Sequence, residues 1–369
     1  MRYFRTIFCL LAGVHFGVSA AVPYLNENGI LIVNEQPCFP VVLYRVPVGE
    51  FTNMKTAGFT CTEVSEYAED QQEMLRYLDA AKEHGFKILP IFNYAATRIL
   101  PDLYQQMVER FRDRDEVLLW YMADEPQEYK ITPEGALSIY KAIKEADPVR
   151  PVFLMLAKVD PAYLEAADII GVDPYPVAND KPLTLVAETI RYVQEKGGGR
   201  PIWACLEAFG ALSYGRPFPS PEELRCTTYM ALAQGIQGIM FFAYGCPEQK
   251  GALQETAPEL WQEVLRLAAE IRDLSPLFTN APCVQSQKLQ PELPGVYSRL
   301  FEREGEQWLL LVNGNRDTAI VTVSLPGFGS TQVNACSQQR IIPLSGDSFQ
   351  VTLAPLEVAW YVMQTENMQ

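Results

Sequence analysis

Short apolar runs alternate with segments of helical periodicity along most of this chain. The runs are bounded by polar residues and lack an exposed face, which is typical of strands buried in a parallel sheet. Between them, apolar residues recur three or four positions apart, as in the segment 70–83, which ends at Gly85. The predicted strands are 41–44, 59–64, 87–92, 117–123, 152–156, 169–173, 201–206 and 238–243.

Eight such strands, each followed by a helix, predict a (β/α)8 barrel between about residues 38 and 276, with its last helix at 258–274. A doubly wound sheet is the alternative, but the first strand is not followed by a GxGxxG turn. Segment 29–44 predicts a hairpin that leads into the first strand.

After Pro276 the pattern changes to short strands separated by turns such as Asn313-Gly314. This pattern predicts a small β-sandwich with a structural role beside the barrel, and carbohydrate binding is the alternative role. We therefore expect a signal segment at 1–20, a barrel at 21–276 and a sandwich at 277–369. The expected sandwich strands are 296–301, 308–312, 319–325, 340–343, 348–353 and 358–362.

The first twenty residues have the pattern of a secretory signal. Arg2 and Arg5 form a basic start, residues 6–18 are apolar, and Val18-Ser19-Ala20 forms a small-residue cleavage site. The apolar run is too short to favour a membrane span. We expect a secreted or periplasmic protein.

The net charge and the residue composition limit which partners and which kinds of site this protein can have. The formal charge is −15, or −17 without Arg2 and Arg5, which disfavours nucleic acid and anionic membranes as partners, although acidity also serves solubility. Seven widely spaced cysteines remain after cleavage, so neither a zinc site nor a disulfide framework is predicted. His84 is then the one histidine. We expect carboxylate chemistry without a cofactor or metal.

Two glutamates stand where predicted strands end. Glu125 follows the run VLLWYMAD, and Glu207 ends PIWACLE. The barrel brings the carboxyl ends of its strands to one face, where catalytic side chains are usually mounted. Each residue alone would be interpreted as a surface acid. As a pair across the mouth, they can hydrolyse a glycosidic bond, one as acid and the other as nucleophile.

The sequence here resembles the clan A glycoside hydrolases, a group that includes β-galactosidases, mannanases and cellulases. The resemblance rests on DEP at 124–126, on Glu207 at the end of strand seven, and on the entry segment NEQPCFPVVLY. It implies a retaining double-displacement mechanism on a β-linked oligosaccharide or polysaccharide. In that mechanism Glu125 is the acid/base and Glu207 the nucleophile.

The resemblance also assigns binding residues and contains two departures. It implies that Tyr175 of DPYP hydrogen-bonds the nucleophile, and that Phe242 or Tyr244 replaces the tryptophan usual on strand eight. Asp124 stands where most of the family has Asn, which contacts a sugar hydroxyl. Ionised Asp accepts but does not donate a hydrogen bond. Its negative charge also helps a neighbouring general acid keep its proton.

Further candidates lie at strand ends or in the loops beyond them. Arg45 is expected to contact Glu207 or a substrate carboxylate, and a plain ion pair is the alternative. Polar side chains that could meet sugar hydroxyls are Glu63, Glu66, Asn93 and Asp173. Phe209 and Tyr214 are the predicted stacking platforms, with Tyr94 as a further candidate, whereas Trp120 and Trp203 are expected in the core.

Two alternatives to a glycosidase stay open. A catalytically silent, carbohydrate-binding barrel is suggested by Asp124 and by the missing tryptophan on strand eight. A metal enzyme would use Glu63, Asp124 and Asp173, although these residues come from well-separated strand ends.

Overall fold

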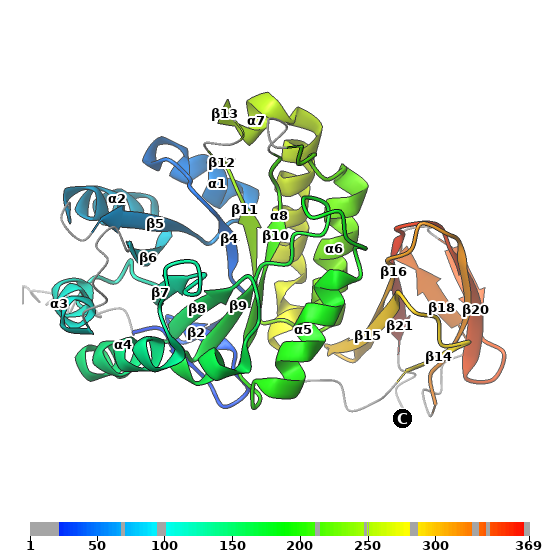
Figure 1. The fold of residues 1–369 in the computed structure, drawn as a ribbon. Helices are drawn as coiled ribbons and strands as arrows, with labels where there is room; N and C mark the ends of the chain where they lie inside the picture. The colour runs from blue at the N-terminus through cyan, green and yellow to red at the C-terminus, as the bar shows by residue number, and fades with distance from the viewer. Residues whose placement is uncertain are drawn as a thin grey trace, which may run out of the picture.

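The computed structural model describes residues 22–67, 71–93, 101–210, 215–246, 249, 251–280, 287–326, 332–336 and 340–364. These residues form a closed barrel of parallel strands, followed by two antiparallel sheets that lie to one side of it (Figure 1). The predicted fold class, a (β/α)8 barrel with a C-terminal β-sandwich, is confirmed. The predicted signal segment lies outside the described residues.

The barrel strands follow one another around the ring in chain order, and β11 pairs with β4 to close it. They are β4 (Val41–Leu43), β5 (Cys61–Tyr67), β6 (Lys87–Asn93), β7 (Trp120–Asp124), β8 (Val152–Leu156), β9 (Ile169–Val172), β10 (Ile202–Glu207) and β11 (Gly238–Phe242). The helices around them are α1 (Phe51–Ala57), α2 (Gln71–His84), α3 (Pro101–Phe111), α4 (Pro133–Ala146), α5 (Leu185–Lys196), α6 (Pro221–Ala233) and α8 (Pro258–Thr279).

Smaller elements complete the barrel. A 3₁₀ helix, η2 (Pro161–Ala166), takes the place of the helix after β8, and another, η1 (Val48–Glu50), precedes α1. The loop after β11 contains the short hairpin β12 (Gly245–Cys246) and β13 (Gly251–Ala252), followed by α7 (Leu253–Thr256). Thr132 caps α4, because its hydroxyl accepts a hydrogen bond from the amide of Gly135 at 3.2 Å.

Side chains that point inward fill the barrel. Tyr121, Phe153 and Trp203 are each no more than 1% exposed, and the rings of Phe153 and Trp203 lie 5.4 Å apart. The N-terminal sheet of β1 (Tyr24–Leu25), β2 (Leu31–Val33) and β3 (Gln36–Cys38) contributes Leu31 to the same cluster. The barrel is therefore a packed core, and substrate access is limited to its ends.

The sandwich consists of a three-stranded and a five-stranded sheet, and it includes all six strands expected from the sequence. On β16, Leu309 and Leu311 face the other sheet, whereas Leu310 and Val312 join the core cluster of the barrel. Because β16 is buried on both faces, its sequence is a continuous apolar run. The strands are β14 (Lys288–Gln290), β15 (Val296–Arg303), β16 (Glu306–Asn313), β17 (Ala319–Ser324), β18 (Gln332–Ala335), β19 (Arg340–Pro343), β20 (Ser348–Leu353) and β21 (Val358–Gln364).

Helix α8 runs further than the sequence suggests. Its end was expected at 274, but it continues through Pro276 to Thr279. A proline in a helix cannot donate to the carbonyl four residues earlier, which is that of Arg272. The hydroxyl of Ser275 donates to that carbonyl instead, at 2.8 Å. Phe278 is buried and packs 5.5 Å from the ring of Phe301 in the sandwich, so tertiary packing favours the extension.

No helix in the described ranges is long and apolar enough to span a membrane. Six cysteines in the described ranges are free thiols, and Cys283 lies outside them.

Candidate active site

A bulge in β7 directs Asp124 into the barrel. Tyr121 pairs with Phe153 on β8, but Ala123 pairs with Leu154, so the register shifts by one residue between them. Without the shift, Tyr121 and Asp124 would point to opposite faces of the strand. The extra residue places both on the inward face. The sequence pattern did not reveal this shift, because residues on both faces of β7 are apolar.

Asp124 ends a chain of hydroxyl groups. The hydroxyl of Tyr121 donates to Asp124 Oδ1 at 2.7 Å, and the hydroxyls of Tyr44 and Tyr121 lie 2.6 Å apart. Since Tyr121 has one proton to give, Tyr44 donates to Tyr121 when Asp124 is ionised. Burial raises the pKa of Asp124 to about 6, against the lowering effect of the Tyr121 hydrogen bond. Tyr44 was not among the sequence candidates, although it stands directly at the end of strand one.

Glu125 follows β7 in a left-handed backbone conformation, with φ of 49°. Few residues other than glycine, asparagine and aspartate adopt this region, and such strain often occurs at functional sites. Its amide donates to the carbonyl of Met155 at 3.1 Å, which fixes the turn against β8. The conformation ends the strand and starts the turn that leads into Pro126.

Asp173 is a buried carboxyl group at the mouth on which the charges of Glu125 and Asp124 act. It directly follows β9 and is 7% exposed. Burial and the charges of Glu125 and Asp124 hold its pKa well above the usual range. Its Oδ1 has no hydrogen-bond partner among the described residues. The structure thus groups carboxyls from the ends of β7 and β9.

The carboxylate of Glu207 is held against the loop after β9. Its two oxygens accept hydrogen bonds from the amides of Val177 at 3.0 Å and Ala178 at 2.6 Å. Burial raises the pKa of Glu207 to about 7, while the two amides oppose that effect. Further charge effects come from Glu223, at the start of α6, and from Arg216. Glu207 is 5% exposed.

Tyr175, Phe209 and Phe242 form an aromatic cluster. The ring of Phe209 is 5.1 Å from Tyr175 and 5.3 Å from Phe242, and it is 6% exposed. The Tyr175 hydroxyl lies 3.5 Å from Cys205 Sγ, so its contact in this structure is a thiol on β10. The guanidinium of Arg45 lies over Phe242, 5.3 Å from the ring centre. Arg45 is exposed and lowers the pKa of Asp124.

The remaining candidates are spread around the mouth. Glu63 is 3% exposed on β5, and its charge acts on buried Tyr44. Tyr244 packs 5.6 Å from Trp261 and borders an open cavity together with Arg45. Trp120 and Trp203 are buried, as expected. Tyr94, Tyr214 and the side chains of Glu66 and Asn93 lie outside the described part of the structure.

Metal binding has little support in the part of the chain described. Within it, no three or more His, Cys, Asp or Glu side chains form a group that could hold a metal ion. Asp124 and Asp173 act on each other electrostatically, but the third residue of that hypothesis, Glu63, does not complete such a group with them.

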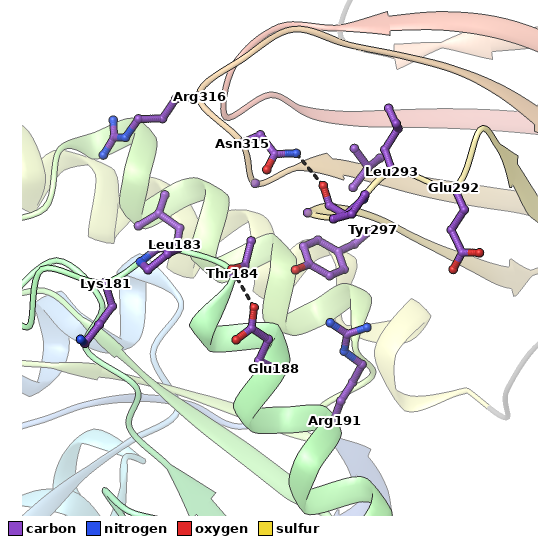
Figure 2. A pocket seen from close by; sticks show the side chains of 15 residues that line it. Lys181, Leu183, Thr184, Glu188, Arg191, Glu292, Leu293, Tyr297, Asn315 and Arg316 are labelled. Carbon is purple, nitrogen blue, oxygen red and sulfur yellow. Dashed lines mark hydrogen bonds between the residues drawn. The ribbon is translucent and has the colours of Figure 1, made fainter.

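A further cavity of about 720 Å³ lies at the seam between the barrel and the sandwich (Figure 2). It is bordered by α5, by the segment before it, and by residues 292–297 and 314–316 of the sandwich. Several of its polar groups pair with each other: Thr184 donates to Glu188 at 2.9 Å, and Asn315 donates to the carbonyl of Pro294 at 2.9 Å (Figure 2). It lies outside the ring of strands, so it is separate from the carboxyl groups at the mouth.

The solved structures that match this chain include carbohydrate-active enzymes. An α-amylase from Geobacillus thermoleovorans, in complex with acarbose, matches with a TM-score of 0.60 and 10% identity over 89% of this chain and 99% of that one. The chain shares its fold. A GH27 β-L-arabinopyranosidase from Geobacillus stearothermophilus matches with a TM-score of 0.60 and 13% identity, over 89% and 97% of the two chains.

A GH30 endoxylanase from Clostridium papyrosolvens matches with a TM-score of 0.53 and 10% identity, over 88% and 96% of the two chains. No protein-family model matches the sequence, and no curated protein matches it. The similarity therefore establishes the fold of a barrel with an appended β-domain. Because one fold supports many activities, function has to be argued from the site.

Proposed function

We propose that this protein is a glycoside hydrolase that acts at the carboxyl-terminal mouth of its barrel. The observation that carries the proposal is the group of Asp124, Glu125 and Asp173 at the mouth, in which two aspartates with a raised pKa accompany a glutamate in a left-handed backbone conformation. None of these three carboxyl groups forms an ion pair with another described residue. Carboxyl groups with perturbed protonation in such a place are suited to acid–base chemistry on a glycosidic bond.

The finer proposal is a retaining reaction on a β-linked oligosaccharide or polysaccharide. Glu125 gives a proton to the glycosidic oxygen while the Glu207 carboxylate attacks the anomeric carbon, and the bond to the leaving oxygen breaks. Glu125 then takes a proton from the water that releases the sugar from Glu207. The amides of Val177 and Ala178 support this role, because they favour the ionised form of Glu207.

The binding residues follow from the same geometry. Arg45 and Tyr244 border the open cavity beside the mouth, where they are available to sugar hydroxyls or a substrate carboxylate. Tyr175 and Phe209, whose rings lie 5.1 Å apart, are the proposed aromatic contacts of the sugar. Asp124 stands where most of the family that the sequence resembles has Asn, and it accepts a hydrogen bond from Tyr121. We propose that its negative charge influences the protonation of the neighbouring carboxyl groups at the mouth.

A panel of aryl α- and β-glycosides tests the reaction class. We expect one β-glycoside to be hydrolysed with retention, seen by NMR of the first product. Glu207→Ala should lower kcat at least about 100-fold, and azide should restore turnover by forming a glycosyl azide. Glu222→Ala, an exposed acid at the start of α6, is the matched control and should remain active. Full activity of Glu207→Ala would refute the nucleophile assignment.

A silent carbohydrate-binding barrel is the second candidate. It is favoured by Glu207, whose carboxylate already has two backbone partners and whose pKa is raised to about 7 by burial. Such a protein would bind a glycan from the panel in a calorimeter and hydrolyse none of the panel. Turnover that Glu125→Gln abolishes would exclude it.

We also propose export, on the signal pattern of residues 1–20. Mass spectrometry of protein made in its own host should find a mature chain that begins at Ala21. An intact Met1 in the mature protein would contradict export by this route.

A further inference from the structure

Two buried tyrosines hold one oxygen of the Asp124 carboxyl group. The hydroxyl of Tyr121 donates to Asp124 Oδ1 at 2.7 Å, and the hydroxyl of Tyr44 lies 2.6 Å from that of Tyr121. Each hydroxyl has a single proton, so when Asp124 is ionised, Tyr121 donates to Asp124 and Tyr44 donates to Tyr121. Hydrogen bonds in such a chain of hydroxyl groups polarise one another, which strengthens the bond that Asp124 accepts.

Packing keeps the two hydroxyl groups in place. The ring of Tyr121 is 0% exposed and packs edge-on against Phe153, with the ring centres 4.7 Å apart. The ring of Tyr44 is 3% exposed and packs against the ring of Phe242, with the ring centres 5.4 Å apart. Because interiors are close-packed, neither ring can follow a movement of the carboxyl group without repacking its neighbours. The two tyrosines therefore fix the orientation of Asp124.

Asp124 is the member of this chain of hydroxyl groups that a ligand can reach. It is partly exposed, whereas both tyrosines are buried. Its Oδ2 accepts no hydrogen bond from the residues that the structure describes. A ligand in the mouth therefore meets Oδ2, and it has to offer a donor such as a hydroxyl group, because an ionised carboxylate only accepts hydrogen bonds.

Charged groups around Asp124 come from several elements of the barrel. The titratable and charged groups that face it, besides Tyr121, are Tyr44 and Arg45 after β4, Glu125 after β7, Asp173 after β9 and Cys205 on β10. The hydrogen bond from Tyr121 lowers the pKa of Asp124 more than the charge of Arg45 does. Tyr121 thus both orients the carboxyl group and favours its ionised form.

We propose that Tyr121 is a positioning residue, supported by Tyr44, that holds the Asp124 carboxylate in one orientation to receive a hydrogen bond from a hydroxyl group of the substrate. For its catalytic part, this inference rests on the proposed glycosidase activity. Tyr121 itself does not touch the substrate, because its side chain is fully buried. The sugar hydroxyl donates a hydrogen bond to Oδ2 and keeps its proton, so no covalent bond changes at Asp124.

An NMR titration of the aspartate carboxyl groups tests the role of Tyr121 without any substrate. Asp124, assigned by the loss of its signal in Asp124→Asn, should titrate with a pKa of about 6 in the wild type. Tyr121→Phe keeps the ring but removes the donor, so this midpoint should move at least about one pH unit higher. Tyr140→Phe is the control, because it removes a similar 2.8 Å bond to Asp168 and should leave the midpoint of Asp124 unchanged. An unchanged midpoint in Tyr121→Phe would overturn the proposal.

Tyr44→Phe keeps the proposal testable if Tyr121→Phe does not fold. The variant leaves the bond from Tyr121 to Asp124 in place and removes only the donor to Tyr121. The midpoint of Asp124 should move in the same direction by a smaller amount, on the order of a few tenths of a pH unit. A midpoint that stays in place or moves lower would overturn the supporting role of Tyr44.

A double-mutant cycle on a glycoside found to be hydrolysed tests the catalytic part. Tyr121→Phe should lower kcat/KM about 10-fold in the wild-type background, but less than about 2-fold in the Asp124→Ala background, where Tyr121 has no carboxylate to position. The same fall in both backgrounds would show a purely structural role and refute positioning. If the wild type hydrolyses no glycoside, the proposed function fails, whereas the titrations still decide whether the two tyrosines hold Asp124.

Discussion

The two ends of the barrel strands treat buried charge differently. At the amino-terminal end, Asp147 and Arg150 form a buried ion pair of 2.8 Å. At the carboxyl-terminal end, the carboxyl groups of Asp124, Glu125 and Asp173 have no ion pair among the described residues. Arg150 is 2% exposed and donates to the carbonyls of Arg112, Arg114 and Val117. The indole of Trp120 donates to Asp147 at 3.0 Å. Each buried charge at this end therefore has several partners.

The protonation of the acids reflects this difference. Burial alone would raise the pKa of Asp147, but the hydrogen bonds and charge of Arg150 outweigh it and lower the pKa. At the mouth, burial and neighbouring acids raise the pKa of Asp124 and Asp173. The comparison indicates that the amino-terminal end is organised for stability, and that the mouth retains carboxyls that destabilise the fold at neutral pH.

The largest effect is expected from Arg150→Met. The change leaves Asp147 buried without its cation and leaves three carbonyls without their donor. Removing one partner of a buried ion pair typically costs about 3 to 5 kcal/mol in the free energy of unfolding. Denaturant unfolding measures this loss. The control is Arg303→Met, which removes an exposed pair with Glu304 and should cost less than about 1 kcal/mol. Equal losses in the free energy of unfolding for the two variants would contradict a stabilising role of the buried Asp147–Arg150 pair.

An intermediate effect of opposite sign is expected from Asp124→Asn. The carboxyl titrates near about pH 3.9 in the unfolded chain and near about 6 in the fold. A raised pKa in the folded state means that stability is lost as the pH rises through this window. The variant should match the wild type at about pH 4 and exceed it by on the order of 2 kcal/mol at about pH 8. A less stable variant at the higher pH would show that ionised Asp124 is paired after all.

The smallest effect is expected from Glu125→Gly. Glycine adopts a φ of 49° without steric strain, so the variant should gain about 0.5 to 1 kcal/mol in the free energy of unfolding. Glu128→Gly, three residues later in the same turn and outside the left-handed set, should gain nothing. A loss of stability in Glu125→Gly would argue against strain at the end of β7.

The sequence pattern was enough to predict the barrel, because each strand is a short apolar run between helices of clear periodicity. Strand ends then follow from chain order alone, which explains why Glu125, Glu207 and Asp173 were recognised as residues at the mouth. Sequence could not predict the end of α8, since a proline normally ends a helix. The Ser275 hydroxyl and the packing of Phe278 depend on tertiary structure.

The geometry of the candidate site was less predictable. The bulge in β7 places Asp124 on the same face as Tyr121, and no feature of the apolar sequence of this strand indicates the bulge. Glu125 and Asp173 follow two strands that are separated by β8, and the charge of Glu125 still raises the pKa of Asp173, an effect that depends on the closed barrel. The backbone partners of Glu207, the amides of Val177 and Ala178, come from the loop after β9, and the periodicity of strands and helices says nothing about the conformation of a loop.

We propose that the mouth retains Glu125 for chemistry and not for stability, and one paired measurement on Glu125→Gln tests this role. Hydrolysis of the best aryl glycoside and the melting temperature are measured on the same preparation. We predict a fall in kcat/KM of at least about 100-fold together with an unchanged or higher melting temperature. Undiminished hydrolysis by a fully folded Glu125→Gln variant would contradict a catalytic role for Glu125.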